Sequence, residues 1–134
     1  MSFQFRLHSV LKLRQQQRDV ERQSVALAKL VHAENVAKQS ELTSIRRAAI
    51  DELRVCNDGD AWKADWVASR QRHAEQLQEA LVLAEAAVAE AESQLQWKLK
   101  RLVASNQAVR VLEQLCERQY SEFQKRVCHQ NLIA

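Results

Sequence analysis

Residues 56–60, Cys56-Asn57-Asp58-Gly59-Asp60, decide how this chain folds. They contain the only glycine of the 134 residues, and the chain has no proline. Asn, Asp and Gly are the residue types that end helices, form tight turns and begin new helices. The sequences on both sides are rich in Ala, Leu, Gln, Glu, Lys and Arg, so nothing in them interrupts helical hydrogen bonding. The sequence therefore predicts two long helices joined by a tight turn.

The predicted fold is all-α, with two long helices forming an antiparallel coiled-coil hairpin. Aromatic residues make up only 5% of the chain and charged residues 28%, a composition that favours long helices over a thick globular core. We expect residues 1–134 to form a single hairpin, with the first helix over about 5–55, the turn over about 56–60 and the second helix over about 61–130. The second helix is then the longer one and overhangs the first at its C-terminal end.

The second helix carries a heptad repeat of apolar residues, the pattern by which one helix packs along another. Nine positions spaced by seven are all apolar: Val67, Ala74, Leu81, Val88, Leu95, Leu102, Val109, Cys116 and Phe123. This column predicts the packing face of the second helix. A less regular rhythm on the first helix predicts its packing face. It runs over Val10, Leu13, Val20, Leu27 and Val31, and after a stretch that is nearly all polar or alanine it resumes at Leu42, Ile45, Ala49 and Leu53.

The C-terminal overhang keeps an apolar stripe although the predicted hairpin gives it no partner. From about Leu115 onward, apolar residues recur at spacings of three and four: Cys116, Tyr120, Phe123 and Val127. Leaving this stripe in water would expose a contiguous apolar patch. We therefore expect it to meet the N-terminal pair Phe3 and Phe5, another chain, or both.

Tryptophans mark two further places. Trp62 and Trp66 stand four residues apart at the start of the second helix, which puts them on one face. They either pack on Ile50 and Leu53 of the first helix or offer a large amphipathic contact to a partner. Trp97 falls outside the apolar column, so we expect it to be exposed.

The charges are unevenly placed, although the net charge is only +3. Residues 1–57 carry ten Lys and Arg against six Asp and Glu, residues 58–96 three against eight, and residues 97–134 seven against three. The hairpin therefore has a basic terminal end and an acidic stretch of second helix near the turn. Acidic residues interleave the basic ones, and the basic stretches lack stacking aromatics, so we expect no nucleic acid as a partner.

The residues that catalysis or cofactor binding requires are missing from the pattern. One glycine cannot make a glycine-rich phosphate loop, and no histidine has a second His or Cys at metal-ligand spacing. We expect no enzyme activity, no cofactor and no metal. The first residues lack a signal-peptide core, and the three cysteines form no CxxC pair. A cytoplasmic protein with free thiols is predicted.

Short motifs near both ends of the chain carry a family resemblance. The opening is Phe3-Gln4-Phe5-Arg6-Leu7, and the later motif is Val111-Leu112-Glu113-Gln114-Leu115 followed by Glu117-Arg118-Gln119 and Tyr120 to Phe123. Both are similar to the corresponding ends of the flagellar type III export protein FliJ family. Length, a single mid-chain turn and the lack of proline agree as well. The last residues, 127–134, depart from the acidic, lysine-containing tail with which members often finish.

The resemblance implies a cytoplasmic component of the flagellar protein export apparatus, similar to the central stalk of rotary ATPases. It implies three partners: the export ATPase hexamer, the cytoplasmic domain of the export gate, and export chaperones. Membrane association would occur through these partners only. The stalk protein of a virulence type III secretion system has the same architecture and is an alternative, as is a coiled-coil adaptor or scaffold of another kind.

The family model also assigns residues to two partner-binding ends. The set for the ATPase at the terminal end is Phe3, Phe5, Leu7, Arg14, Leu112, Leu115, Arg118 and Tyr120. The set for the export gate near the turn is Leu42, Ile45, Ala49, Trp62, Trp66 and His73. Charge is expected to orient the ATPase contact, and the aromatic and leucine side chains to supply most of its affinity.

Overall fold

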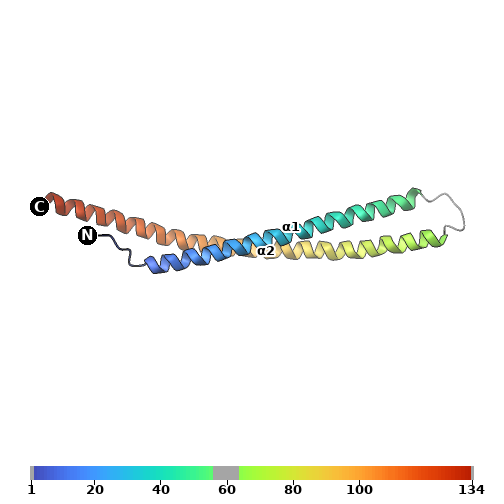
Figure 1. Ribbon diagram of the computed structural model, residues 1–134, viewed down its shortest axis with the longest axis horizontal. Helices are drawn as coiled ribbons and strands as arrows, with labels where there is room; N and C mark the ends of the chain where they lie inside the picture. Colours follow the sequence, from blue (N-terminus) through green and yellow to red (C-terminus); the bar gives the residue numbers. More distant parts are fainter. Residues whose placement is uncertain (1, 56–63, 134) are drawn as a thin grey trace. The chain divides into compact units, whose positions relative to one another are not determined.

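A computed structural model describes residues 2–55 and 64–133 of the chain. Helix α1 runs over His8–Val55 and helix α2 over Ala64–Ile133. The two helices pack antiparallel as a hairpin (Figure 1), so the predicted all-α fold is confirmed. The predicted turn at 56–60 and Trp62 lie outside the described residues.

The N-terminal segment differs from the prediction, because α1 begins at His8 and not near residue 5. The His8 amide donates a hydrogen bond of 3.1 Å to the carbonyl of Phe5, and the Leu11 amide donates one of 2.9 Å to the carbonyl of Leu7. Phe5 is 9% exposed. Because α1 begins only at His8, the residues before it can fold their aromatic rings onto the protein. A helix extended through these residues would carry the rings into water.

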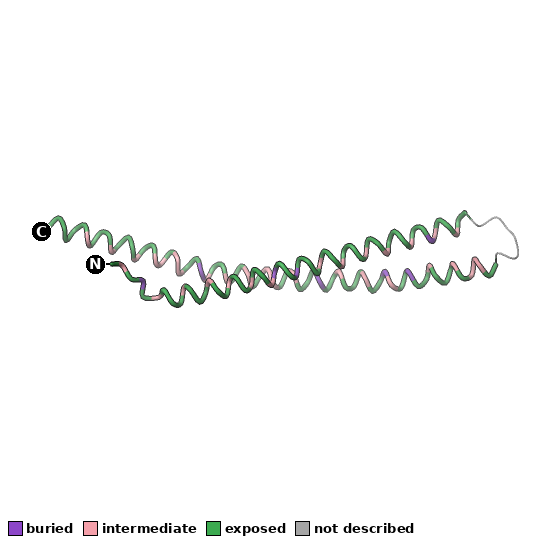
Figure 2. The backbone as a smooth tube through the Cα atoms, in the orientation of Figure 1, coloured by how far each residue is buried: buried purple, intermediate pink, exposed green. Residues whose placement is uncertain are grey.

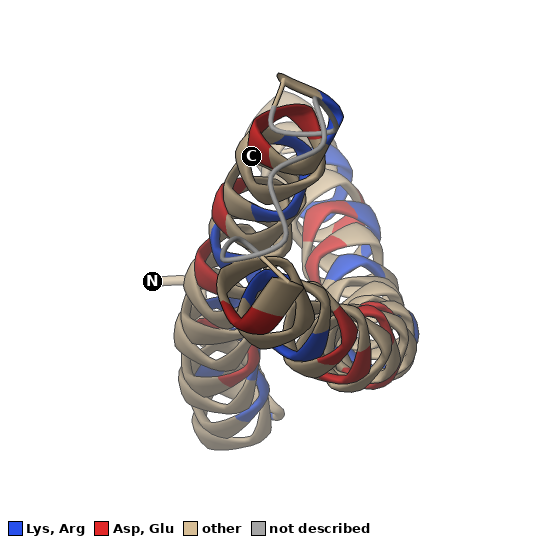
Figure 3. Ribbon diagram, turned by 90° about the vertical axis from the view of Figure 1, so that its right-hand side faces the viewer, with Lys and Arg blue, Asp and Glu red and all other residues tan. Residues whose placement is uncertain are grey.

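The chain divides into two compact units. Unit 1 comprises Met1–Leu27 and Gln96–Ala134, and unit 2 comprises Ala28–Leu95. Each unit contains a segment of α1 packed on a segment of α2, and charged residues of both signs lie along both helices (Figure 3). Unit 1 carries twelve Lys and Arg against five Asp and Glu, whereas unit 2 carries eight against twelve. The two units therefore have opposite net charge.

The apolar column predicted for α2 is confirmed. All nine of its members are buried or half-buried. Figure 2 shows buried and half-buried positions recurring along α2. Val109 in unit 1 is 2% exposed and Leu81 in unit 2 is 8% exposed. Cys116 belongs to this column and is a free thiol, as is the exposed Cys128, in agreement with the prediction for these two cysteines.

The apolar rhythm predicted for α1 is wrong in its N-terminal part, where Val10, Leu13, Val20, Leu27 and Val31 are between 40% and 64% exposed. In its C-terminal part Leu42, Ala49 and Leu53 are buried or half-buried, as predicted, and Ile45 is exposed. The face that packs on α2 keeps a heptad rhythm in another phase. Its buried or half-buried members are Leu11, Arg18 and Val25 in unit 1, and Ala28, His32, Gln39, Leu42, Arg46, Ala49 and Leu53 in unit 2.

The adopted phase of α1 is the one that continues through the middle of the helix without placing Glu or Lys against α2. Continuing the exposed stripe by sevens along α1 reaches Glu34, Lys38 and Glu41, and packing those charges against α2 would cost more than it gains. The adopted phase brings in Ala28 and Ala49 instead, which are 7% and 6% exposed. Small side chains at these positions let the two helices approach closely.

Two arginines on the α1 packing face are incompletely paired. The Nε atoms of Arg18 and Arg46 are buried and have no hydrogen-bond partner. Arg18 Nε lies 3.6 Å from Asp19 Oδ1, which is too long for a hydrogen bond. The packing face of α1 is therefore more polar than that of α2.

Candidate partner-binding surfaces

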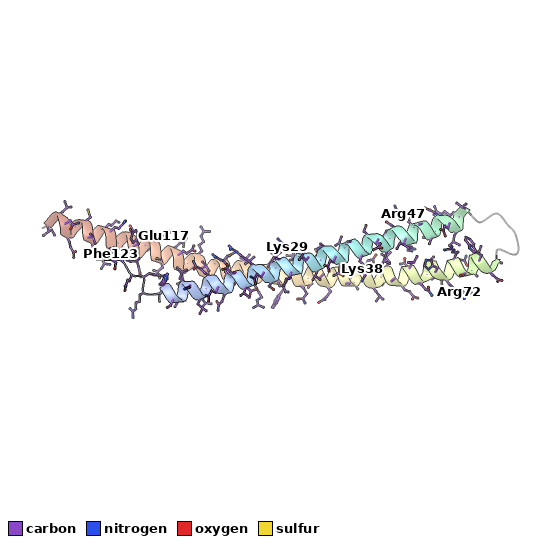
Figure 4. All side chains as sticks on the ribbon, viewed as in Figure 1. Lys29, Lys38, Arg47, Arg72, Glu117 and Phe123 are labelled. Atoms are coloured by element: carbon purple, nitrogen blue, oxygen red, sulfur yellow. The ribbon has the colours of Figure 1, made fainter. Side chains whose placement is uncertain are left out.

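Phe3 joins the N-terminal segment to the C-terminal part of α2. Its ring centroid lies 5.2 Å from that of Tyr120 in an edge-on arrangement, with 64° between the ring planes, and 5.5 Å from that of Phe123. Figure 4 shows Phe123 where the N-terminal segment approaches α2. We call Phe3, Tyr120 and Phe123 the aromatic clasp. The expected contact of the overhang with Phe3 is confirmed.

The residues assigned to the ATPase all lie in unit 1, but they differ in accessibility. Arg14, Arg118 and Tyr120 are exposed, and Tyr120 is 45% exposed although it belongs to the clasp. The half-buried members are Phe3, Leu7, Leu112 and Leu115. Phe5 is buried, so its ring holds the N-terminal segment in place and does not present a surface to a partner.

The residues assigned to the gate lie in unit 2 wherever they are described. Ile45 and His73 are exposed, and Leu42 and Trp66 are half-buried. Ala49 is 6% exposed and packs between the helices, so it cannot touch a partner while they stay together. A contact surface in this unit would consist of the exposed and half-buried members.

An arginine holds the Trp66 ring and connects α2 to α1 in unit 2. The guanidinium carbon of Arg70 lies 5.2 Å from the centroid of the Trp66 ring, a cation–π distance. Arg70 Nη1 also lies 3.4 Å from Glu52 Oε2 of α1. The tryptophan is therefore held at a fixed place on the surface by a residue that is itself anchored across the helix pair.

Unit 1 contains the same arrangement. The guanidinium carbon of Arg101 lies 4.8 Å from the centroid of the Trp97 ring, and Arg101 Nη2 lies 3.1 Å from Glu21 Oε1 of α1. Trp97 is 54% exposed, as the sequence predicted. Rigid, half-exposed aromatic side chains of this kind are common anchors in protein interfaces, because binding them costs little conformational entropy.

These two Trp-Arg-Glu triads were missed in the sequence. A local signal was available, because the stretches 66–70 and 97–101 both read Trp-x-x-x-Arg. A spacing of four puts the guanidinium over the ring on a helix surface. The glutamates could not be assigned from sequence, because they depend on the register between the helices. The two glutamates are as far apart in the sequence of α1 as the two arginines are in the sequence of α2.

A groove opens between α1 and α2 in unit 1 beside the second triad. It has a volume of about 610 Å³ and is lined by Leu13, Gln16, Gln17, Val20, Glu21, Arg101, Ala104 and Ser105. Its apolar wall comes from Leu13 and Val20, two residues that the sequence placed in the packing face. We call this feature the unit 1 groove.

The Glu21–Arg101 pair yields a prediction for stability. Glu21→Gln should lower the free energy of unfolding by about 0.5–1 kcal/mol, because the pair is short but partly exposed to solvent. Glu52→Gln is the matched control, since the Glu52–Arg70 pair is longer and its carboxylate more exposed, and it should cost less than about 0.5 kcal/mol. Urea unfolding followed by circular dichroism measures both. Equal losses of unfolding free energy in the two variants would show that the shorter distance does not make the Glu21–Arg101 pair stronger.

Among residues 2–55 and 64–133, no three His, Cys, Asp or Glu side chains gather closely enough to hold a metal ion. Neither α1 nor α2 has a segment apolar enough over a sufficient length to cross a membrane. Comparison of the chain with protein-family models, with curated proteins and with solved structures gives no match.

Proposed function

We propose that this chain is a non-enzymatic connector of the flagellar type III export apparatus, acting in the cytoplasm. The observation that carries the proposal is the aromatic clasp. It brings together the two segments in which the chain resembles the FliJ family, since Phe3 belongs to the opening motif and Tyr120 and Phe123 belong to the later one. A contact between both motifs supports a shared surface to which both contribute.

Unit 1 is the part that binds the export ATPase hexamer in this proposal. The exposed residues Arg14 and Arg118 give the surface positive charge, in a unit with twelve basic and five acidic residues. Positive charge steers an acidic partner into place and raises the association rate. Tyr120 and the half-buried leucines then supply the apolar contact from which most affinity comes. This division of labour suits a stalk-like element inside an ATPase ring.

Unit 2 is the part that binds the cytoplasmic domain of the export gate. Its surface is different in kind, because acidic residues outnumber basic ones and the aromatic anchor is Trp66, held by Arg70. Ile45 and His73 add exposed contacts. Two units of opposite net charge suit two different partners. Export chaperones are a third class of partner in this proposal. A virulence secretion stalk or another coiled-coil adaptor would use the same two-surface design.

The experiment uses the purified chain with the export ATPase and the gate domain from the same genome. The chain should stimulate ATP hydrolysis by promoting assembly of the ATPase ring. Arg118→Glu should weaken ATPase binding about tenfold, because it reverses an exposed charge at the binding surface. His73→Glu serves as the matched control in unit 2, and should weaken gate binding but leave ATPase stimulation unchanged.

Two results would contradict this function. One is an ATPase rate and a ring population that do not change over a wide range of chain concentrations. The other is loss of both interactions in both variants, which would mean that the two units do not bind separate partners. Specific capture of cytoskeletal or vesicle proteins, with no secretion ATPase or gate among them, would favour the adaptor alternative.

A further inference from the structure

The exposed apolar stripe of α1 in unit 1 is not explained by packing within the hairpin. Leu13, Val20 and Leu27 are 52%, 64% and 62% exposed, and they follow one another by sevens. Leu13 and Val20 also form the apolar wall of the unit 1 groove. A heptad stripe beside a groove between two helices has the geometry that accepts a third helix.

Basic residues border this groove. Lys12 and Lys100 are exposed, and each lies one helical turn before a residue that lines the groove, Gln16 on α1 and Ala104 on α2. Arg101 lines the groove as well, but its charge is paired with Glu21 of the same groove, so the two lysines supply the net positive charge. A helix with exposed apolar residues and acidic neighbours therefore complements the groove in both hydrophobicity and charge.

The chain itself contains such a helix segment, on α2 in unit 2. Five glutamates occur within it and no lysine or arginine interrupts them: Glu75, Glu79, Glu85, Glu90 and Glu92. Val82 and Leu83 lie among these glutamates and are 52% and 72% exposed. Glu79 and Leu83 are one turn apart, and Glu75 and Glu90 fall on the same face of the helix, so these three glutamates flank the apolar pair. We call residues 75–92 the acidic segment.

We propose that the acidic segment of one copy of this chain docks in the unit 1 groove of a second copy. The acidic segment and one wall of the groove both lie on α2, which is uninterrupted over Ala64–Ile133, so a second copy is the source of the docking segment. Docking covers Leu83 and Val20 and brings the glutamates to the lysines. Pairing of two unit 1 surfaces is disfavoured, because both carry a large excess of basic residues. The inference does not rest on the export role.

Self-association of the purified full-length chain is the test, measured by sedimentation equilibrium over a range of protein concentrations. The chain should form a reversible dimer that weakens when the salt concentration rises from about 0.05 M to about 0.5 M, since exposed charges are screened. The variant Glu79→Lys with Glu90→Lys lowers the net charge of the acidic segment from −5 to −1. The variant Lys12→Glu with Lys100→Glu reverses the groove border. Each double variant should raise the dissociation constant at least about tenfold.

Mixing the two double variants gives the sharpest readout. Each variant alone pairs one altered surface with one original surface. In the mixture, the original acidic segment of the groove variant can dock in the original groove of the segment variant, so a heterodimer should form with nearly the affinity of the original chain. Lys125→Glu with Arg126→Glu is the matched control, because it changes the net charge of unit 1 equally at exposed positions that do not line the groove. This control should dimerise like the original chain.

Three results would overturn the inference. The first is a monomer at all concentrations and at low salt. The second is a dimer that either double variant leaves intact, which would place the contact elsewhere. The third is a mixture of the two variants that stays monomeric although circular dichroism shows both to be helical. Leu83→Ser provides a check without any change of charge, and should weaken the dimer at high and low salt alike.

Discussion

Replacing Gln39 and Arg46 with leucine should stabilise the protein by about 1–2 kcal/mol for each substitution. Both residues sit on the α1 packing face in unit 2, where α2 contributes the buried side chains of Leu77 and Leu81. Arg46 Nε is buried without a hydrogen-bond partner, so the folded state bears the cost of removing it from water. Leucine at position 46 removes that cost, and leucine at either position adds apolar contact with the facing helix.

Urea unfolding monitored by circular dichroism measures the gain. Lys38→Leu with Arg47→Leu is the matched control, because these neighbours are exposed (Figure 4) and the change in composition is similar. The control should stay within about 0.5 kcal/mol of the original chain. Stabilisation of the same size in the control would mean that helix propensity or the unfolded state, and not the packing face, causes the gain.

The difference between the two helices shows what the sequence could predict. On α2 the apolar column continues for nine heptad positions, so only one face can pack inward and the prediction was right. On α1 two phases compete. The phase with larger side chains near the N-terminus, such as Leu13 and Val20, is more visible in the sequence but ends in charged residues. The phase that wins is built partly from alanine, and its advantage lies in running the length of the helix.

The candidate surfaces, like the two helices, could be predicted from the sequence only in part. The contact of Phe3 with the overhang followed from a local argument, since an apolar stripe without a partner needs cover. The exposure of Trp97 followed from its place outside the column. Glu21 could not be assigned to Arg101, because a pair across two helices requires their register, which the weak repeat of α1 does not fix. The unit 1 groove could not be predicted, because the sequence pattern places Leu13 and Val20, which form its apolar wall, in the packing face.

Substituting Phe3 and Phe5 together by alanine should release the N-terminal segment and loosen the C-terminal part of α2. Phe5 is 9% exposed and Phe3 contacts two rings, so the two truncations together should cost about 3–4 kcal/mol of local stability. Helicity should fall little, because the rest of the helix pair keeps its contacts. Hydrogen exchange should report the change as protection lost from backbone amides around residues 116–127, by at least about tenfold.

Trp97→Ala separates the clasp from a general effect of losing an aromatic ring. Trp97 lies in the same unit but is 54% exposed, so its removal should leave the exchange around residues 116–127 unchanged. If the double phenylalanine variant loses most of its helicity, the rings support the whole helix pair and not only its terminal part. If its exchange pattern equals that of the original chain, the clasp contributes no order. In the proposed function, loosening of this region without unfolding should weaken ATPase binding, because Tyr120 loses the ring that positions it.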